Sequence, residues 1–362
     1  MTICREDHGS LPVVPSPHGG GQGRHDSHDS HDIEMSEFSL IQRFFAARGA
    51  SPLDGPGGLR VGIGDDCAVF SLAADEELVI TTDTLVSGVH FPEDSAAELV
   101  GQRALRVNLS DIAAMGGHAC WFMLALTLPN DDESWLQAFC DGLFSAAREY
   151  GCGLIGGNTT RGPLTISITA CGRLPRGQAL LRSGASADDE IYVTGTLGDA
   201  AAALRVIGSS AALGPANEND NSAWLLKRYW QPSPRLAEGL ILRGLASAAI
   251  DISDGLLADL GHLADASGLG AELWLDALPE SSALRAVVTD CVDRHALAVT
   301  GGDDYELCFT VSPQRVSLLE AEISAGRLSA SRVGRMVTDK GVRCYDNSGK
   351  QVNFVKSGYQ HF

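Results

Sequence analysis

Aspartate recurs in this chain inside short, nearly apolar strings that are flanked by glycine. The four strings contain no Lys or Arg, and they are GIGDDCAVF (62–70), TTDTLV (81–86), NLSDIAAMGG (108–117) and AIDISDG (249–255). An isolated ionised carboxylate is costly to remove from water, so a fold that buries these strings must supply a counter-charge. Mg²⁺ is the economical one, because it binds a few carboxylates together with substrate phosphates. The pattern predicts a metal-dependent phosphate enzyme.

Composition narrows the class of protein. With 362 residues, 44% of them hydrophobic and 20% charged, the chain is long enough for two globular cores. The net charge of −19 argues against binding to nucleic acid or to an anionic membrane through a basic face. No apolar run approaches the ~20 residues of a membrane span. We therefore expect a soluble protein with no nucleic-acid or membrane partner.

The cysteines indicate a reducing compartment. There are nine of them, an odd number, and none forms a CxxC pair. Such scattered thiols are typical of a cytoplasmic protein, and they lack the spacing of a structural zinc site or a disulfide framework.

Residues 1–34 differ from the rest, being rich in Gly, Pro, His and Asp, with HDSHDSHD at 25–32. Without an apolar stretch they are not a signal peptide. We interpret them as a disordered leader or a mis-assigned start upstream of Met35, with transition-metal binding as the open alternative.

From Met35 the chain predicts interleaved helices and strands, an α+β architecture. In its first half we expect helices over 35–49, from a capping box at Ser95 and Glu98 to Met115, and over 134–150, with strands at 77–86 and 164–172. The turn-rich stretch 174–190 predicts a domain boundary near 183, giving an N-terminal domain over 35–182 and a C-terminal domain over 183–362.

In the second half we expect strands at 191–195, 271–277 and 306–311, helices near 234–246 and 255–267, and a surface loop at 208–222.

Each candidate residue also has a structural interpretation. Asp65 and Asp66 suit an Asx turn, Asp83 the end of a strand, and Asp251 and Asp254 the acidic entry to a helix.

His90 and Arg182, outside the aspartate strings, also have more than one interpretation. His90 is compatible with an ordinary packed histidine, and Arg182 with either a solvated cation or a phosphate clamp. The chain has no GxxxxGK[ST] loop and no kinase HRD or DFG set, so phosphate chemistry needs another scaffold.

A longer series of strings resembles one family over nearly everything from Met35 onward. The series is EFSLI, GIGDDCA, TDTLVSGVHF, NLSDIAAMG, LALTLP, IGGNTTRGPL, LLRSGAS, YVTGTLGD, QPSPR, AIDISDGLLADLGH, GGDDYELCFT and GYQHF. They resemble the thiamine-monophosphate kinases, relatives of aminoimidazole ribonucleotide synthetase and selenophosphate synthetase.

The resemblance implies two α/β domains of the aminoimidazole ribonucleotide synthetase type, with N-terminal sheets that pair in a homodimer. It implies phosphorylation of thiamine monophosphate to thiamine diphosphate, with ATP as co-substrate and Mg²⁺ as cofactor, by direct in-line transfer.

The resemblance also implies roles for single residues. The Mg²⁺ ligands would be Asp66, Asp83, Asp111, Asn158, Asp251 and Asp254, of which Asp111 and Asp254 would be catalytic. The nucleotide contacts would be Thr81, Thr82, Gly157, Arg182 and Ser253. The substrate contacts would be His90, Asp303 and Tyr359.

Two positions depart from the family's pattern. Asn158 replaces an aspartate, which removes a charge from a metal site, and Asp303 replaces a glutamate, which shortens a substrate contact by one methylene. Two alternatives stay open: another ATP-using enzyme of the superfamily, or a catalytically impaired protein that binds nucleotide or thiamine phosphate.

Overall fold

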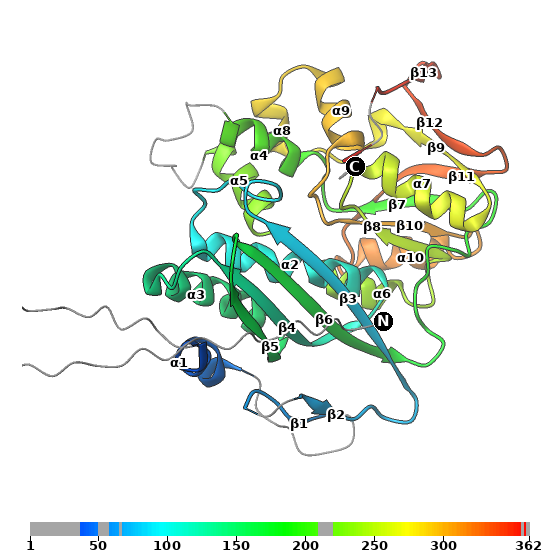
Figure 1. Cartoon of the computed structure of the whole chain (residues 1–362). Helices are drawn as coiled ribbons and strands as arrows, with labels where there is room; N and C mark the ends of the chain where they lie inside the picture. The colour runs from blue at the N-terminus through cyan, green and yellow to red at the C-terminus, as the bar shows by residue number, and fades with distance from the viewer. Residues whose placement is uncertain (1–36, 50–57, 65–66, 209–219, 356–357, 360–362) are drawn as a thin grey trace, which may run out of the picture. The chain divides into compact units, whose positions relative to one another are not determined.

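The computed structural model describes residues 37–49, 58–64, 67–208, 220–355 and 358–359, all of which belong to one compact unit, Met35–Phe362. The interpretation of residues 1–34 lies outside the described residues. Two sheets interleaved with helices confirm the α+β prediction (Figure 1). Among the described residues, no helix is both long enough and apolar enough to cross a membrane.

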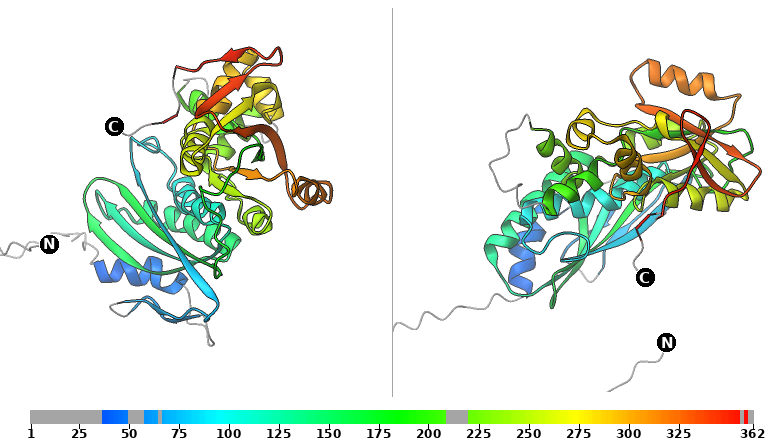
Figure 2. Two further views of the ribbon diagram at one scale, coloured as in Figure 1. Left: turned by 90° about the vertical axis from the view of Figure 1, so that its right-hand side faces the viewer. Right: turned by 90° about the horizontal axis from the view of Figure 1, so that it is seen from above.

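The first sheet contains four strands in the order β3-β6-β4-β5. They are β3 (Glu76–Val86), β6 (Thr165–Pro175), β4 (His118–Leu128) and β5 (Gly153–Arg161). Neighbours are antiparallel except for β4 and β5, which are parallel. The two long helices α2 (Ala97–Ala114) and α3 (Glu133–Tyr150) cover one face of this sheet (Figures 1 and 2).

The opposite face of this sheet is partly covered at one end. The short antiparallel strands β1 (Leu59–Val61) and β2 (Val69–Phe70) contribute Leu59 and Phe70 to a small apolar cluster with Trp121 and Cys171. Further along the same face, Ile80 is 58% exposed and Met123 is 38% exposed. This face therefore leaves apolar surface uncovered in the single chain.

The predicted first helix is present but irregular. It consists of α1 (Glu37–Leu40), a π-helical turn η1 (Ile41–Phe45) and a 3₁₀ turn η2 (Ala46–Arg48). Phe44 and Phe45 are buried in the same core as α2 and α3. The segment therefore packs through Phe44 and Phe45 as a helix would, but its backbone hydrogen bonds differ from those of a regular α-helix.

The second sheet contains seven strands in the order β13-β12-β9-β11-β7-β10-β8. They are β7 (Glu190–Thr194), β8 (Ala248–Asp251), β9 (Gly270–Trp274), β10 (Leu307–Val311), β11 (Ala330–Val337), β12 (Gly341–Tyr345) and β13 (Gln351–Val352). Only the β12–β9 pair is parallel. The first sheet ends at Pro175 and the second begins at Glu190; the domain boundary near 183 stays a prediction.

Helices cover both faces of this second sheet. One core contains α7 (Leu256–Ser267) and α9 (Cys291–Thr300), and another contains α6 (Leu236–Leu242) and α10 (Val316–Ser324). The predicted helix over 234–246 is therefore shorter than expected.

The remaining elements are α4 (Asp199–Gly208), α5 (Asn221–Trp230), η4 (Leu275–Ala277) and α8 (Ser282–Val287). The central part of the predicted loop at 208–222 lies outside the described residues.

The predicted capping box at the start of α2 is wrong. The helix begins at Ala97, its N-cap residue Ala96 provides no side-chain bond, and the Ser95 hydroxyl donates to the Pro92 carbonyl at 2.5 Å. The α3 prediction is confirmed: Asp132 accepts hydrogen bonds from the first turn, and Gly151 ends the helix in the left-handed conformation.

Helices α2 and α3 approach each other closely through two glycines. A Cβ on Gly101 would lie 2.2 Å from the Phe139 carbonyl oxygen, and one on Gly142 would lie 1.9 Å from the Glu98 carbonyl oxygen. The contacting atoms are backbone, so neither helix can yield by rotating a side chain. This contact fixes α2 against the sheet, and α2 carries much of the site described below.

We predict that Gly142→Ala lowers the free energy of unfolding by about 1–3 kcal/mol, because the added methyl group must push two helix backbones apart. The matched control is Gly261→Ala in α7, where a Cβ meets nothing within 4 Å. That substitution should stabilise by roughly 0.5–1 kcal/mol through helix propensity. Urea denaturation measures both, and equal effects would contradict the proposed close contact.

Candidate active site

Strand β3 divides its polar residues between the two faces of the first sheet. Alternation places Thr81 and Asp83 towards α2, whereas Thr82 lies on the opposite face and bonds to Thr169 at 2.8 Å. The candidates Thr81 and Thr82 are therefore adjacent in sequence but serve different surfaces.

Asp83 and Asp111 meet where β3 crosses α2. The Thr81 hydroxyl donates to Asp111 Oδ2 at 2.5 Å. The buried Asn108 side chain accepts from the Asp83 amide at 3.1 Å and donates to the Ala104 carbonyl at 2.9 Å. Asn108 and Asp111 thus lie on the same face of α2, and Asn108 joins the helix to the edge strand.

Asp251 and Asp254 come to the same region from the second sheet. Asp251 ends β8, is buried, and accepts from the Ser110 hydroxyl of α2 at 2.8 Å. In the following turn, one Asp259 oxygen accepts from the amides of Ser253, Asp254 and Gly255 at 3.1 Å each.

Helix α7 begins after Gly255 without a side-chain cap. Asp254 is therefore not a helix cap, because Asp259, which the sequence analysis did not identify, takes the free amides.

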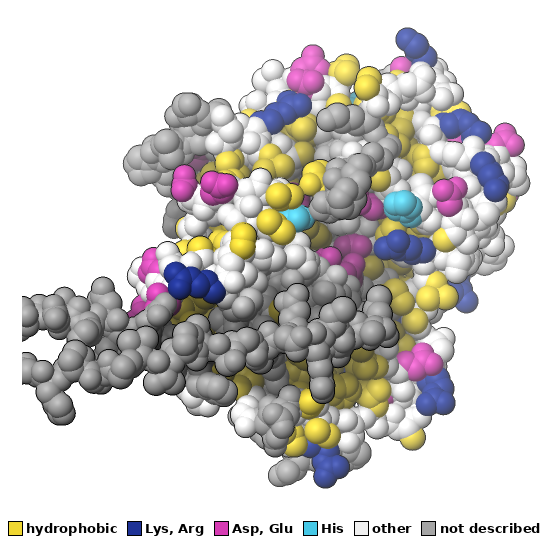
Figure 3. Space-filling model, in the orientation of Figure 1, with side chains coloured by type: hydrophobic (Ala, Val, Ile, Leu, Met, Phe, Trp, Pro, Cys, Tyr) yellow, Lys and Arg dark blue, Asp and Glu magenta, His cyan; other side chains and the backbone are white. Residues whose placement is uncertain are grey.

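The pKa values show that these carboxylates interact. Burial raises the pKa of Asp83 to about 6, with further increases from Asp111 and Asp254. Burial and the nearby Asp111 raise the pKa of Asp251 to about 8. Burial also raises the pKa of Asp111, against the lowering effects of the Thr81 hydrogen bond and of Arg182. Four acids from three separate segments of the chain thus converge, and Arg182 provides some cationic compensation. Figure 3 shows acidic side chains near the middle of one face of the molecule, next to a basic one.

This donor set fits Mg²⁺ that is bound together with phosphates. Within the described ranges, no three His, Cys, Asp or Glu side chains are grouped so that they could hold a metal ion alone. Mg²⁺, however, usually takes one or two carboxylates and completes its octahedron with water and phosphate oxygens. Hard oxygen donors with raised pKa values and few cations provide that chemistry. Asp66, a further predicted ligand, lies outside the described residues.

The other nucleotide and metal candidates are spread over both faces of the first sheet. Asn158 is exposed on β5, on the face that carries Thr82 and Thr169, and the register places two strands between Asn158 and β3. Gly157 precedes it, and a Cβ there would lie 1.9 Å from the Leu124 carbonyl oxygen, so only glycine fits. Asn158 is thus not brought to the carboxylates by the fold of one chain.

Arg182 and Ser253 lie nearer the acidic cluster. The Arg182 side chain is exposed and lies close enough to lower the pKa of Asp111. Ser253 is half-buried in the turn held by Asp259. Both are placed beside the region where phosphates would meet the carboxylates.

The three substrate candidates, His90, Asp303 and Tyr359, lie in three separate loops. His90 Nδ1 accepts from the Val86 amide at 3.0 Å, and the Tyr359 amide donates to the Asp254 carbonyl at 3.0 Å. Asp303 pairs with Arg103 and accepts from the Tyr305 hydroxyl at 3.1 Å. Asp303 and Tyr305 both adopt the left-handed backbone, with φ of 71° and 50°. Non-glycine residues persist there only when their surroundings hold them.

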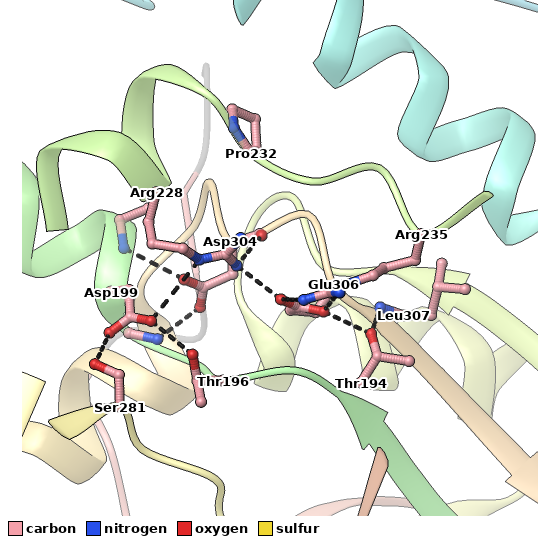
Figure 4. A network of polar contacts seen from close by, with 12 residues as sticks. Thr194, Thr196, Asp199, Arg228, Pro232, Arg235, Ser281, Asp304, Glu306 and Leu307 are labelled. Atoms are coloured by element: carbon pink, nitrogen blue, oxygen red, sulfur yellow. Dashed lines mark hydrogen bonds and ion pairs between the residues drawn. The ribbon is translucent and has the colours of Figure 1, made fainter. Parts of the chain in front are cut away.

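A buried network of charged and polar side chains holds the start of β10, which follows the loop with Asp303 and Tyr305 (Figure 4). Glu306 is fully buried and accepts from Arg228 at 2.7 Å, from Arg235 at 2.5 and 2.6 Å, and from the Thr194 hydroxyl at 2.6 Å. Asp304 accepts from the Gly198 amide at 2.7 Å, and burial raises its pKa well above the usual value.

The strings YVTGTLGD, QPSPR and GGDDYELCFT meet in this network. Their shared structural role is not apparent from the sequence alone.

Arg103, Tyr229 and Tyr305 are also near the site and were missed. Arg103 is buried in α2, with its guanidinium 4.2 Å from the centre of the Tyr229 ring. An arginine at a position of α2 that faces the core is a signal, because a buried charge needs partners.

Comparison with known proteins identifies the family to which the chain belongs. Two family models match, described as AIR synthase related protein, N-terminal domain, at residues 64–174, and AIR synthase related protein, C-terminal domain, at residues 186–347. The chain is 45% identical over 332 residues to the thiamine-monophosphate kinase of Salmonella typhimurium strain LT2, covering 91% of this chain and 99% of that protein.

The chain belongs to the thiamine-monophosphate kinase family. Solved structures of the family are similar to it as well. The thiamine-monophosphate kinase of Stenotrophomonas maltophilia K279a superposes with a TM-score of 0.75 at 46% identity, over 81% of this chain and 92% of that one. The complex named "AaThiL complexed with AMPPCP and TMP" superposes with a TM-score of 0.70 at 30% identity, over 91% of this chain and 97% of that one. These matches confirm the predicted family and the two-domain type of fold.

Without divalent cations, we predict that the free energy of unfolding falls as pH rises from about 4 to about 8. Asp83 and Asp251, with pKa values of about 6 and about 8, keep protons in the folded state that carboxyls with the ordinary pKa of 3.8 release on unfolding. Asp251→Asn should flatten this dependence by at least about 1 kcal/mol.

Urea denaturation between pH 5 and pH 8 measures this effect. The control Asp265→Asn alters an exposed acid of α7 and should keep the slope of the unmodified protein. An unchanged slope in Asp251→Asn would show that this carboxyl is ionised throughout.

Proposed function

We propose that this protein transfers the γ-phosphoryl group of ATP to the phosphate of thiamine monophosphate, forming thiamine diphosphate. The observation that carries the proposal is the 45% identity to thiamine-monophosphate kinases over 91% of the chain. The solved relative that carries AMPPCP and TMP together supports ATP as donor and thiamine monophosphate as acceptor.

The chain's own residues supply positioning and electrostatics for this reaction. Asp83, Asp111, Asp251 and Asp254 would hold Mg²⁺, which when bound neutralises the phosphates and so offsets the repulsion between donor and acceptor. Arg182 lies beside Asp111 and would orient nucleotide phosphate. Asp111 and Asp254 would act as the catalytic pair through this charge placement.

The acceptor phosphate oxygen is already largely ionised, so no strong general base is required. The route we propose is direct in-line transfer without a phosphorylated enzyme.

Substrate contacts would come from His90, Asp303 and Tyr359. The hydrogen bond from the Val86 amide to His90 Nδ1 places the proton of the neutral imidazole on Nε2. Ser253, Thr81, Thr82 and Gly157 remain proposed nucleotide contacts.

We also propose a homodimer joined through the first sheet, in a cytoplasmic protein. The partly uncovered face with Ile80 and Met123 supports pairing, because a second copy would cover this apolar surface. Thr82 and Asn158 lie on that same face. A dimer would therefore enclose these candidates as well.

Product analysis separates the alternatives. Purified protein with ATP, Mg²⁺ and thiamine monophosphate should release ADP and thiamine diphosphate in equal amounts. Formation of ADP with another acceptor would indicate a different enzyme of the superfamily, and binding without ADP would indicate an impaired protein.

We predict that Asp111→Asn lowers kcat by a factor of about 100 or more while thermal unfolding changes little, because a carboxylate facing the phosphates becomes neutral. The exposed Asp265→Asn is the control and should keep full turnover. Near-normal kcat in Asp111→Asn would contradict a catalytic role for this carboxylate.

For Asn158→Asp we predict that half-maximal activity is reached at a lower Mg²⁺ concentration, since the substitution restores a charged ligand. The control Asn130→Asp adds the same charge at another exposed position and should leave the Mg²⁺ titration unchanged. An unaltered titration in Asn158→Asp would remove this residue from the metal site.

A further inference from the structure

We propose that Arg103 is a positioning residue for the acceptor substrate. It fixes the carboxylate of Asp303 so that one oxygen remains free to accept a hydrogen bond from an N–H donor of the bound substrate. The inference rests on the proposed function, in which thiamine monophosphate carries such a donor in its aminopyrimidine amine.

The Arg103 guanidinium is held in one orientation. Its side chain is 3% exposed, lies over the Tyr229 ring at 4.2 Å, and donates from Nη1 to the Tyr229 carbonyl at 2.6 Å. From Nη2 it donates to Asp303 Oδ1. Nε has no hydrogen-bond partner among the residues that the structure describes. Burying Nε without a partner costs free energy, so the contacts that stabilise Arg103 in this position are those to Tyr229 and Asp303.

The two oxygens of Asp303 are used unequally. Oδ1 accepts from both Arg103 Nη2 and the Tyr305 hydroxyl, the latter at 3.1 Å. Oδ2 accepts no bond from any described residue, and the side chain is 25% exposed. An ionised carboxylate can accept about four hydrogen bonds. Oδ2 therefore keeps its full accepting capacity on a side chain that solvent can reach.

The loop around Asp303 is already fixed against the acidic cluster. The Asp303 amide donates to the Ser253 carbonyl at 2.8 Å, and the Tyr305 amide donates to the Ile252 carbonyl at 2.8 Å. These bonds fix the backbone but not the rotation of the carboxylate about its side-chain bonds. Arg103 supplies that second constraint, which matters more for a short aspartate because its reach cannot be adjusted by an extra methylene.

Tyr229 also connects Arg103 to His90, another of the substrate candidates. The Tyr229 hydroxyl donates to the His90 carbonyl at 3.0 Å, while the Tyr229 ring and carbonyl hold Arg103. Arg103 and Tyr229 thus join the His90 and Asp303 loops into one rigid wall. This wall orients the part of the substrate that does not react.

Steady-state kinetics of Arg103→Lys tests the inference. The lysine keeps the charge but cannot bridge Tyr229 and Asp303 in a planar fork. We expect KM for thiamine monophosphate to rise about tenfold or more, with KM for ATP and kcat within about threefold of the unmodified protein.

Arg106→Lys is the matched control. Arg106 lies one turn further along α2 and is equally buried, but it bonds to Glu149 at 2.7 Å and to the Tyr150 hydroxyl at 2.6 Å. An equal rise in KM in both variants would assign the effect to general packing and overturn the proposal, as would no rise in Arg103→Lys.

A double-mutant cycle shows whether Arg103 acts through Asp303. On an Asp303→Asn background, Arg103→Lys should raise KM for thiamine monophosphate by less than about twofold; independent, multiplicative effects would overturn the proposal. If Arg103→Lys does not fold, Tyr305→Phe removes the other Oδ1 donor and should raise the same KM with kcat preserved. An unchanged KM in that variant would overturn the proposal too.

Calorimetric binding of thiamine monophosphate distinguishes two kinds of failure. An unmodified protein that neither binds nor phosphorylates it would overturn the proposed function, and with it this inference. An unmodified protein that binds it as tightly as Arg103→Lys does would overturn the inference alone.

Discussion

The desolvation of a group of carboxylates is the constraint on which this structure depends. Burial raises the pKa values of Asp83, Asp111 and Asp251, and the charge of Asp111 raises those of the other two further. Arg182 and a hydrogen bond from Thr81 offset the rise at Asp111. A fold does not gain stability from such an arrangement. Perturbed carboxylates of this kind are typical of functional sites, where a bound cation can supply the missing counter-charge.

Helix α2 turns this constraint into a defined geometry. Asn108 ties it to β3 of the first sheet, Ser110 to Asp251 of the second, and Arg103 to the loop before β10. The close contact with α3 at Gly101 leaves the helix little freedom to shift. A rigid helix that carries polar groups through its buried interior can align acids from both sheets more accurately than loops could.

A second buried group of charges supports the loop that precedes β10. Glu306, held by Arg228 and Arg235, anchors the strand that follows two residues in left-handed backbone. Strain at Asp303 and Tyr305 persists because this anchor and the Asp303–Arg103 pair hold both sides of the turn. The strings YVTGTLGD, QPSPR and GGDDYELCFT, which meet at Glu306, thus contribute to holding the backbone in place.

The sequence by itself determined the α+β class, the family and the positions of several helices and strands, because residue spacing and apolar periodicity are local properties. It did not determine that Thr81 rather than Thr82 faces α2, that Asp259 rather than Asp254 holds the turn before α7, or that Arg103 meets Asp303 two hundred residues away. Those facts depend on which elements pack together. Charge pairing and desolvation act through space, so only the tertiary structure decided them.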